Sequence, residues 1–252
     1  MPLRDVCDDA ALFQRRCRAV RLIWWTFVSM TVLLMPSTGA CSGLVIEDWS
    51  GTPTGTRGVP SGWREQDPPR GGHMTVVAEG DIRKLHLVST NNSWSITKDL
   101  RNTAKDLKSG VDVNQTPILE WWWKVTALPS GADARQEATI DYAAGLCVSW
   151  LRYLELIRSR HICYLWDTVA PVETIVTSKQ NPTIAFIVVR SGTADLGMWV
   201  KEERDIRDDF RRVYGASPDV VGLIAIAISS VRTRSTAETW WGSIAFHRRT
   251  RP

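Results

Sequence analysis

The segment Ile118–Val125 constrains the fold more than any other, because its apolar side chains recur at every second residue. One face of an extended chain would carry Leu119, Trp121, Trp123 and Val125. The opposite face would carry Ile118, Glu120, Trp122 and Lys124. A period of two, built from aromatic and β-branched residues, is typical of a β-strand with one face in a core. The segment therefore predicts a sheet whose inner face buries tryptophan.

Other segments also favour extended structure. Lys84–Ser89 alternates, with Leu85 and Leu87 on one face. Thr183–Val189 and Val220–Ile228 are continuous apolar runs bounded by Gly or Pro, which fits central strands covered on both faces. Shorter β-rich runs occur at Met74–Ala78 and Trp240–Phe246. This number of strand signals predicts an all-β protein.

One short helix interrupts this pattern. Asp205 stands at the N-cap position, and Ile206 and Phe210 follow one turn apart on the same face. Gly215 is a suitable C-terminal stop. The stretch Ala134–Ile157 is ambiguous, because its apolar residues recur every three or four positions and periodicity alone favours a long helix there.

The first forty residues have the order of a signal peptide. Four arginines between positions 15 and 21 precede the uncharged run Leu22–Met35, and the small or helix-breaking residues Pro36–Ala40 follow. We expect cleavage after Ala40. Cys41 comes next and is a candidate for lipidation, as in a bacterial lipoprotein. The alternative is an uncleaved anchor helix, although the run is shorter than the about 20 residues that span a bilayer.

Cysteine and charge set further limits. Cys147 and Cys163 are a candidate disulfide in an oxidising compartment, and the alternative is two buried thiols. The four histidines are scattered, so neither they nor the cysteines have the spacing of a metal site. A formal net charge of +4 gives no indication of a nucleic-acid partner. Nucleotide-binding glycine loops and the G-x-S-x-G pattern are absent from the sequence.

The 13 tryptophans suggest a ligand class. An indole face can stack on a sugar ring while nearby polar groups bind its hydroxyls. Trp122 and Trp240 are the better candidates, with Glu120 beside Trp122 on the same strand face. Trp121 and Trp123 are better explained as core residues. The alternative is that all of these indoles are simply large core side chains.

Two carboxylates are further ligand-binding candidates. Asp141 and Asp167 lie near the ends of segments expected to be neighbouring strands. A pair of carboxyl groups at the right separation could also act on a glycosidic bond, but a sequence does not give the separation. No catalytic residue is therefore assigned.

Several segments, taken in order, resemble a bacterial family known only as domain of unknown function 3047. The matching segments are Leu44–Ser50, Gly58–Trp63, Leu119–Arg135, Asp141–Ala144, Tyr164–Asp167, Ile187–Gly192 and Gly197–Ile206, then D-D-F-R-R-V-Y-G and W-W-G-S-I-A-F. The resemblance implies an exported all-β domain of jelly-roll type and brings no established activity. It also implies that Asp141–Trp150 is a strand, followed by a loop or short helical insert and a strand at His161–Trp166.

The chain departs from the family pattern at Ser229–Arg234, where the family segment is acidic. Ser229 and Val231 replace carboxylates and Arg234 replaces a glycine, while Ser243 replaces a third carboxylate in the last strand. Calcium takes six to eight oxygen ligands, so these losses weigh against a calcium site. No metal and no cofactor are predicted.

The sequence thus predicts a leader at 1–40 and a single domain at 41–252, a jelly-roll-like β-sandwich with one short helix near residues 206–214. The favoured function is a non-catalytic glycan-binding module of the cell envelope, periplasmic or held at the membrane as a lipoprotein. The alternatives are a structural or protein-interaction domain and, last, a polysaccharide-acting enzyme. The expected partner is a glycan or an envelope protein, with membrane contact only through the leader or Cys41.

Overall fold

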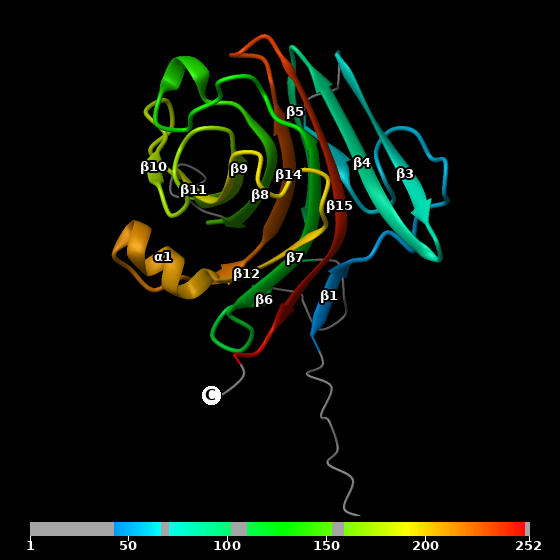
Figure 1. Ribbon diagram of the computed structural model, residues 1–252. Helices are drawn as coiled ribbons and strands as arrows, with labels where there is room; N and C mark the ends of the chain where they lie inside the picture. Colours follow the sequence, from blue (N-terminus) through cyan, green and yellow to red (C-terminus); the bar gives the residue numbers. More distant parts are fainter. Residues whose placement is uncertain (1–42, 67–70, 102–109, 153–158, 250–252) are drawn as a thin grey trace, which may run out of the picture. The chain divides into compact units, whose positions relative to one another are not determined.

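The computed structural model describes residues 43–66, 71–101, 110–152 and 159–249. These residues form a jelly-roll-like β-sandwich of two facing sheets with one α-helix, as the sequence predicts (Figure 1). The leader and Cys41 lie outside the described residues. Within the described part of the chain, the single α-helix is too short and too polar to span a bilayer.

The first sheet has six strands. In spatial order they are β12 (Val200–Asp205), β7 (Ile118–Ala127), β15 (Thr236–His247), β4 (Ile82–Thr90) and β3 (Gly72–Glu79), with β1 (Leu44–Glu47) also paired to β15. The pairs are antiparallel. The strand β7 contains the alternating segment of the sequence, and its alternate residues Leu119, Trp121 and Trp123 are fully buried.

The second sheet has seven strands. In spatial order they are β10 (Ile175–Thr177), β11 (Ile184–Ser191), β9 (Arg160–Asp167), β8 (Tyr142–Trp150), β14 (Leu223–Ser229), β5 (Ser93–Asp99) and β2 (Arg64–Glu65). Only the pair β9–β11 is parallel. A separate ribbon pairs β6 (Val111–Asp112) with β13 (Val220–Val221).

The core lies between the two sheets and is rich in indole rings. Trp121, Trp123 and Trp241 come from the six-stranded sheet, and Trp166 and Tyr164 come from the seven-stranded sheet. The Trp123 ring lies 5.5 Å from the Trp241 ring and 5.8 Å from the Trp166 ring, measured between centroids. These tilted contacts are the preferred geometry of buried aromatic pairs, so the sheets are joined largely through aromatic side chains.

Helix α1 (Ile206–Tyr214) has the ends that the sequence predicts. The Asp205 carboxylate accepts a hydrogen bond from the backbone N–H of Asp208, which caps the N-terminus. Gly215 has a φ of 66° and its N–H donates to the Arg211 carbonyl, which closes the C-terminus. A short 3₁₀ turn, η1 (Glu137–Thr139), is the other helical element in the described residues.

A buried polar network attaches this helix to the sandwich. The Tyr164 hydroxyl donates to Asp209 at 3.0 Å, and Arg204 forms an ion pair with the same carboxylate at 2.7 Å. Burial beside this carboxylate raises the pKa of Tyr164 well above its usual value, so the phenol remains a donor. The network joins α1, β12 and β9.

The ambiguous segment resolves as a strand. Tyr142–Trp150 forms β8, although its apolar spacing alone favours a helix. Tertiary pairing explains the outcome, because β8 lies between β9 and β14 and hydrogen-bonds to both. The insert after it falls in part on residues 153–158, which lie outside the described residues.

The apolar runs in β11 and β14 are not covered symmetrically. In β14 the Ile224 and Ile226 side chains enter the core, whereas Ala225 and Ala227 face outward into a hollow. In β11 Ile187 enters the core and Phe186 faces outward. The expectation of strands covered on both faces is confirmed for β14, where six of the seven residues are buried, and holds in part for β11, where Phe186 is half-buried beside the hollow.

Candidate functional site

Trp240 lies on the outer face of the six-stranded sheet, but its ring is already occupied. Its strand, β15, runs between β4 and β7, and Trp240 pairs in register with His86 on one side and Lys124 on the other. The His86 ring stacks on the indole at 3.9 Å between centroids, and the Lys124 ammonium lies 4.7 Å from it. Both neighbours compete with a sugar for the ring, so the structure does not favour Trp240 as a ligand platform.

The second tryptophan of this face, Trp199, extends the same arrangement. Lys84 and Lys124 lie 4.5 and 4.9 Å from its ring, and its indole N–H donates to Glu79 at 2.9 Å. Such cation–π contacts are worth about 0.5–1 kcal/mol each at exposed sites. We call Lys84, Trp199, Lys124, Trp240 and His86 the aromatic ladder.

The remaining candidates on this face are Trp122 and Glu120. Trp122 is half-buried and lines a hollow of about 490 Å³ together with Trp199 and Lys84. Glu120 forms an ion pair with Lys201 at 3.1 Å. The structure therefore places Trp122 and Glu120 on one face, as the alternation predicts, and Trp240 lies on the same face, but among side chains that already bind one another.

Glu120 also belongs to a small group of metal-ligating residues. One ligand atom from each of Glu120, Glu203 and His247 lies within 4.8 Å of the others. The Lys201 ammonium contacts both carboxylates of this group. Because lysine already supplies a positive charge there, we interpret the group as an ion-pair network.

Asp141 and Asp167 have structural roles. Asp141 is fully buried and accepts hydrogen bonds from the Ser229 hydroxyl and from the backbone and side chain of Thr233. Asp167 is fully buried and accepts from the backbone N–H groups of Ala134, Val169 and Ala170 at 2.7–2.8 Å. Their oxygens are occupied inside the protein, so the prediction that they bind a ligand is corrected.

The outer face of the seven-stranded sheet is hollowed as well. It holds a hollow of about 530 Å³ over the strands, which we call the central hollow. A second hollow of about 340 Å³ lies at one end, between the loops that follow β10 and β14, and we call it the loop-end hollow. Ser93, Tyr142 and Phe186 line both, so the two form one continuous groove.

The floor of the groove is apolar. Cys163, Leu165 and Val188 form a small buried cluster on this side of the sheet, and Tyr142 and Phe186 pack against it from outside. Both aromatic rings are half-buried, which leaves part of each exposed to the groove. Such a floor offers a surface on which an apolar ring face can stack.

A glycine makes room for one of these rings. A Cβ atom on Gly145 would come within 3.0 Å of the Tyr142 ring and 3.3 Å of Leu165. The absence of a side chain in the middle of β8 therefore lets the Tyr142 ring lie down over the strand. Burial raises the pKa of Tyr142 to about 12, so its hydroxyl stays protonated.

The polar groups of the groove stand mainly along β5 and β8. Ser93, Ser95 and Thr97 alternate with the core residues Trp94 and Ile96, so their hydroxyls share the outer face. On the other side of β14, Ser149 and His161 line the central hollow. Hydroxyl and imidazole groups both donate and accept hydrogen bonds, as does a sugar hydroxyl.

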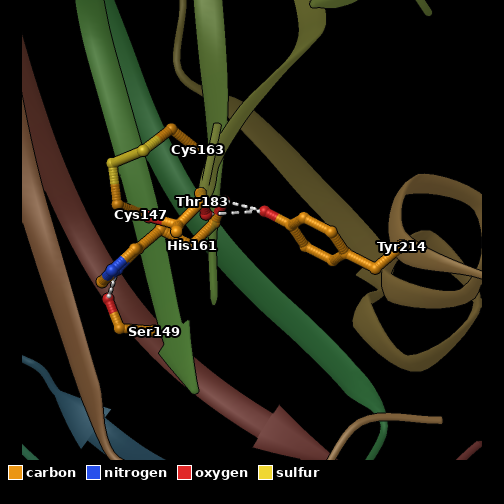
Figure 2. Close-up of a disulfide and its surroundings, with 6 residues drawn as sticks. All are labelled: Cys147, Ser149, His161, Cys163, Thr183 and Tyr214. Atoms are coloured by element: carbon orange, nitrogen blue, oxygen red, sulfur yellow. Dashed lines mark hydrogen bonds between the residues drawn. A yellow bond between two sulfur atoms is a disulfide. The ribbon is translucent and has the colours of Figure 1, made fainter. Parts of the chain in front are cut away.

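A disulfide joins the two strands beneath the groove. Cys147 and Cys163 are paired directly across β8 and β9. Figure 2 shows the disulfide and the His161–Ser149 pair on the same side of these strands, with Tyr214 approaching from α1. The His161 Nδ1 atom lies 2.8 Å from the Ser149 hydroxyl, and burial lowers the pKa of His161. The imidazole is therefore neutral at pH 7.

The Tyr214 hydroxyl fixes the strands from the opposite direction. It lies 2.8 Å from the His161 carbonyl oxygen and 2.9 Å from the Thr183 carbonyl oxygen (Figure 2). These two residues lie at the beginnings of the neighbouring parallel strands β9 and β11, so the last residue of the helix holds one wall of the groove.

The sequence analysis did not predict this groove, because it took tryptophan as the sign of a binding face. The available signal was the alternation of small and hydroxyl residues with large ones, as in S-W-S-I-T at Ser93–Thr97 and the Ala–Ile alternation at Ile224–Ile228. Short side chains on one face of a strand allow a hollow there.

Comparisons with known proteins give a family and a distant likeness. The model of the family described as protein of unknown function DUF3047 matches residues 62–245. Among curated proteins no relative is found.

Solved structures resemble the chain only weakly. The xyloglucanase domain of NopAA from Sinorhizobium fredii, in complex with cellobiose, is 10% identical with a TM-score of 0.43, over 79% of this chain and 100% of that one. The family 30 carbohydrate-binding module of a cellulosomal cellulase of Clostridium thermocellum is 14% identical with a TM-score of 0.45, over 83% of this chain and 99% of that one. At these values neither likeness says what this chain binds.

Proposed function

Since the chain belongs to the DUF3047 family of proteins of unknown function, we propose from its own groove that it is a glycan-binding module. One observation carries the proposal: the outer face of the seven-stranded sheet is a continuous groove with an apolar floor and a line of hydroxyls. The half-buried Tyr142 and Phe186 rings would stack on sugar rings. The hydroxyls of Ser93, Ser95 and Thr97 would bind sugar hydroxyls.

The composition of the groove supports binding rather than hydrolysis. Glycosidases use two carboxyl groups about 5–10 Å apart across the bond that is cut. Among the described residues that line the two hollows, Glu137 is the one carboxylate. The buried Asp141 and Asp167 have their oxygens engaged by protein donors. We therefore propose a non-catalytic role.

A glycan-array screen with matched variants tests this proposal. The purified chain is expected to bind a restricted set of glycans. Phe186→Ala should weaken that binding about tenfold or more, because one stacking face is lost, which amounts to about 1.4 kcal/mol. Trp240→Ala is the matched control, since it removes an aromatic ring from the other sheet and should leave binding unchanged.

The opposite pattern would refute the groove. Binding that survives Phe186→Ala and Tyr142→Ala but is lost in Trp122→Ala would move the site to the six-stranded sheet. An array without any specific signal, on protein shown to be folded, would favour the alternative of an envelope interaction domain.

We further propose that the module acts outside the cytoplasm. The disulfide between Cys147 and Cys163 supports this, because such bonds persist in oxidising compartments. The basic, apolar and small-residue order of positions 1–40 supports it as well. Fractionation of cells that express the full chain should place it in the periplasm or membrane, with a lipid mass on Cys41 that Cys41→Ser removes. A cytoplasmic product with an intact N-terminus would contradict the proposal.

A further inference from the structure

The loop-end hollow differs from the central hollow in its charge. Its described lining includes Arg135, Lys179 and Arg232, against the single carboxylate of Glu137. The described lining of the central hollow holds neither a carboxylate nor an arginine or lysine. The groove therefore has a neutral middle and a charged end.

Two of these three cations are available to a ligand. Arg135 donates two hydrogen bonds to Asp133, at 2.7 and 2.8 Å, and this holds the pKa of Asp133 at about 2. Lys179 and Arg232 are both exposed, and their side chains form no ion pair or hydrogen bond with any residue that the structure describes.

The acidic groups near this end are buried, with one exception. Asp133, Asp141 and Asp167 are buried, and each accepts hydrogen bonds from at least three donors. Glu137 is the exception, because it is exposed and accepts only from Gln180 at 3.0 Å among the described residues. A ligand entering from solvent can thus reach the exposed Lys179 and Arg232, with Glu137 as the opposing charge.

The apolar lining continues into this hollow. Ile140, Val176 and Val231 line it together with Phe186, and Val231 is exposed. A ring with one apolar face and one anionic substituent would fit such a lining, since its face could rest on these side chains while its charge pairs with lysine or arginine.

We propose that the loop-end hollow takes a sugar that carries a carboxylate, a uronic acid, and that Lys179 and Arg232 bind its charge. This inference rests on the proposed glycan-binding function and adds the class of glycan. The central hollow would hold neutral faces of the same chain.

Matched probes separate charge from shape. The purified full chain is titrated with hexamers of galacturonate and of mannuronate and with the methyl esters of both, in which the carboxylate charge is absent. We expect at least one acid to bind about tenfold more tightly than its ester. We also expect the affinity of the protein for the acid to fall as the salt concentration is raised, because exposed ion pairs are screened by salt. The affinity for the ester should not change.

Charge variants identify the residues. The double variant Lys179→Gln with Arg232→Gln should remove the preference for the acid and leave the affinity for the ester as it was. The matched control is Arg57→Gln with Lys201→Gln, which removes the same charge from residues outside the groove and should keep the preference. Glu137→Gln should increase the affinity for the acid about threefold, a gain that a misfolded variant cannot imitate.

Three results would overturn the inference. Equal binding of acid and ester, or of neutral glycans alone, would refute the uronate site and leave the proposed glycan function standing. An equal loss in the control double variant would show that only net charge matters. Failure of every glycan on the array as well as these probes would refute both proposals together.

Discussion

The two outer faces of the sandwich are built in opposite ways. On the six-stranded sheet, the aromatic ladder binds Trp199 and Trp240 between lysine and histidine, and the hollow beside Trp122 is lined by these engaged side chains. On the seven-stranded sheet, alanine, serine and cysteine side chains leave a groove floored by Tyr142 and Phe186.

This difference teaches that ring size alone does not identify a binding face. An indole whose neighbours already stack on it is part of the structure, while a smaller ring beside short side chains can meet a ligand. What each ring already contacts, rather than aromatic content, separates the two faces.

The largest expected effect is on the free energy of unfolding. It is seen when one carboxylate from each sheet is removed. Asp167→Ala would leave three backbone N–H groups without an acceptor, those of Ala134 and Ala170 buried and that of Val169 part-buried, which should cost about 3 kcal/mol or more in the free energy of unfolding. Glu120→Ala should cost less than about 1 kcal/mol, because its ion pairs are partly exposed. Urea unfolding of both variants measures the difference. Equal losses of unfolding free energy in the two variants would contradict the structural role assigned to Asp167.

The disulfide comes next. Reduction, or the double change of Cys147 and Cys163 to Ser, removes a cross-link between residues 16 apart in sequence and should cost about 3 kcal/mol. Because the bond lies under the groove, glycan affinity should fall too, while the near-UV signal of the buried tryptophans persists at temperatures where the variant remains folded. A variant that loses stability but binds normally would show that the disulfide does not shape the groove.

Aromatic truncation sharpens the comparison further. Trp240→Ala and Phe186→Ala each remove a half-buried ring and should cost about 2 kcal/mol of unfolding free energy. The contrast lies in binding, which only Phe186→Ala should reduce. Thermal unfolding combined with glycan titration of both variants checks this. Reduced binding in Trp240→Ala would break the proposed division between the faces.

The smallest effect is the pH dependence of stability. Here a histidine on each face should behave in the same way. Burial lowers the pKa of His86 in the ladder and of His161 in the groove below the usual value of 6.5. Both folded-state rings favour the neutral form, so their contribution to stability is complete above about pH 6.5 and is lost as the pH falls through the lowered pKa values. NMR titration should find both rings below 6.5, and His86→Gln or His161→Gln should flatten the acid side of the stability curve. A ring that titrates above 6.5 would contradict the assignment of burial as the cause.

Much of the fold could be predicted from the sequence. The period of two in Ile118–Val125 predicted β7 with its buried indoles. Asp205 and Gly215 predicted the two ends of α1. These features are local, so neighbouring residues carry the whole signal. The strand β8 needed the family resemblance, because its pairing with β9 and β14 overrides an apolar spacing that suits a helix.

The candidate site was harder to predict. Trp240 was singled out as a ligand candidate, yet no local pattern shows that His86 and Lys124 would contact its ring from two other strands. Asp141 and Asp167 were singled out as carboxylates, but the Asp141 donors Ser229 and Thr233, and the Asp167 donor Ala134, lie far away in sequence. The groove arises where Ser95, Tyr142 and Phe186 meet from three strands, and that meeting depends on sheet order.

The central claim is that the glycan binds on the seven-stranded sheet. Hydroxyl-radical footprinting of the full chain, with and without a saturating acidic oligosaccharide, tests it most directly because the oxidation of each aromatic side chain is read separately. We predict protection of Tyr142 and Phe186, with no change at Trp122, Trp199 and Trp240. Protection of Trp122 and Trp199, with Tyr142 and Phe186 unchanged, would contradict the account and move the site to the opposite sheet.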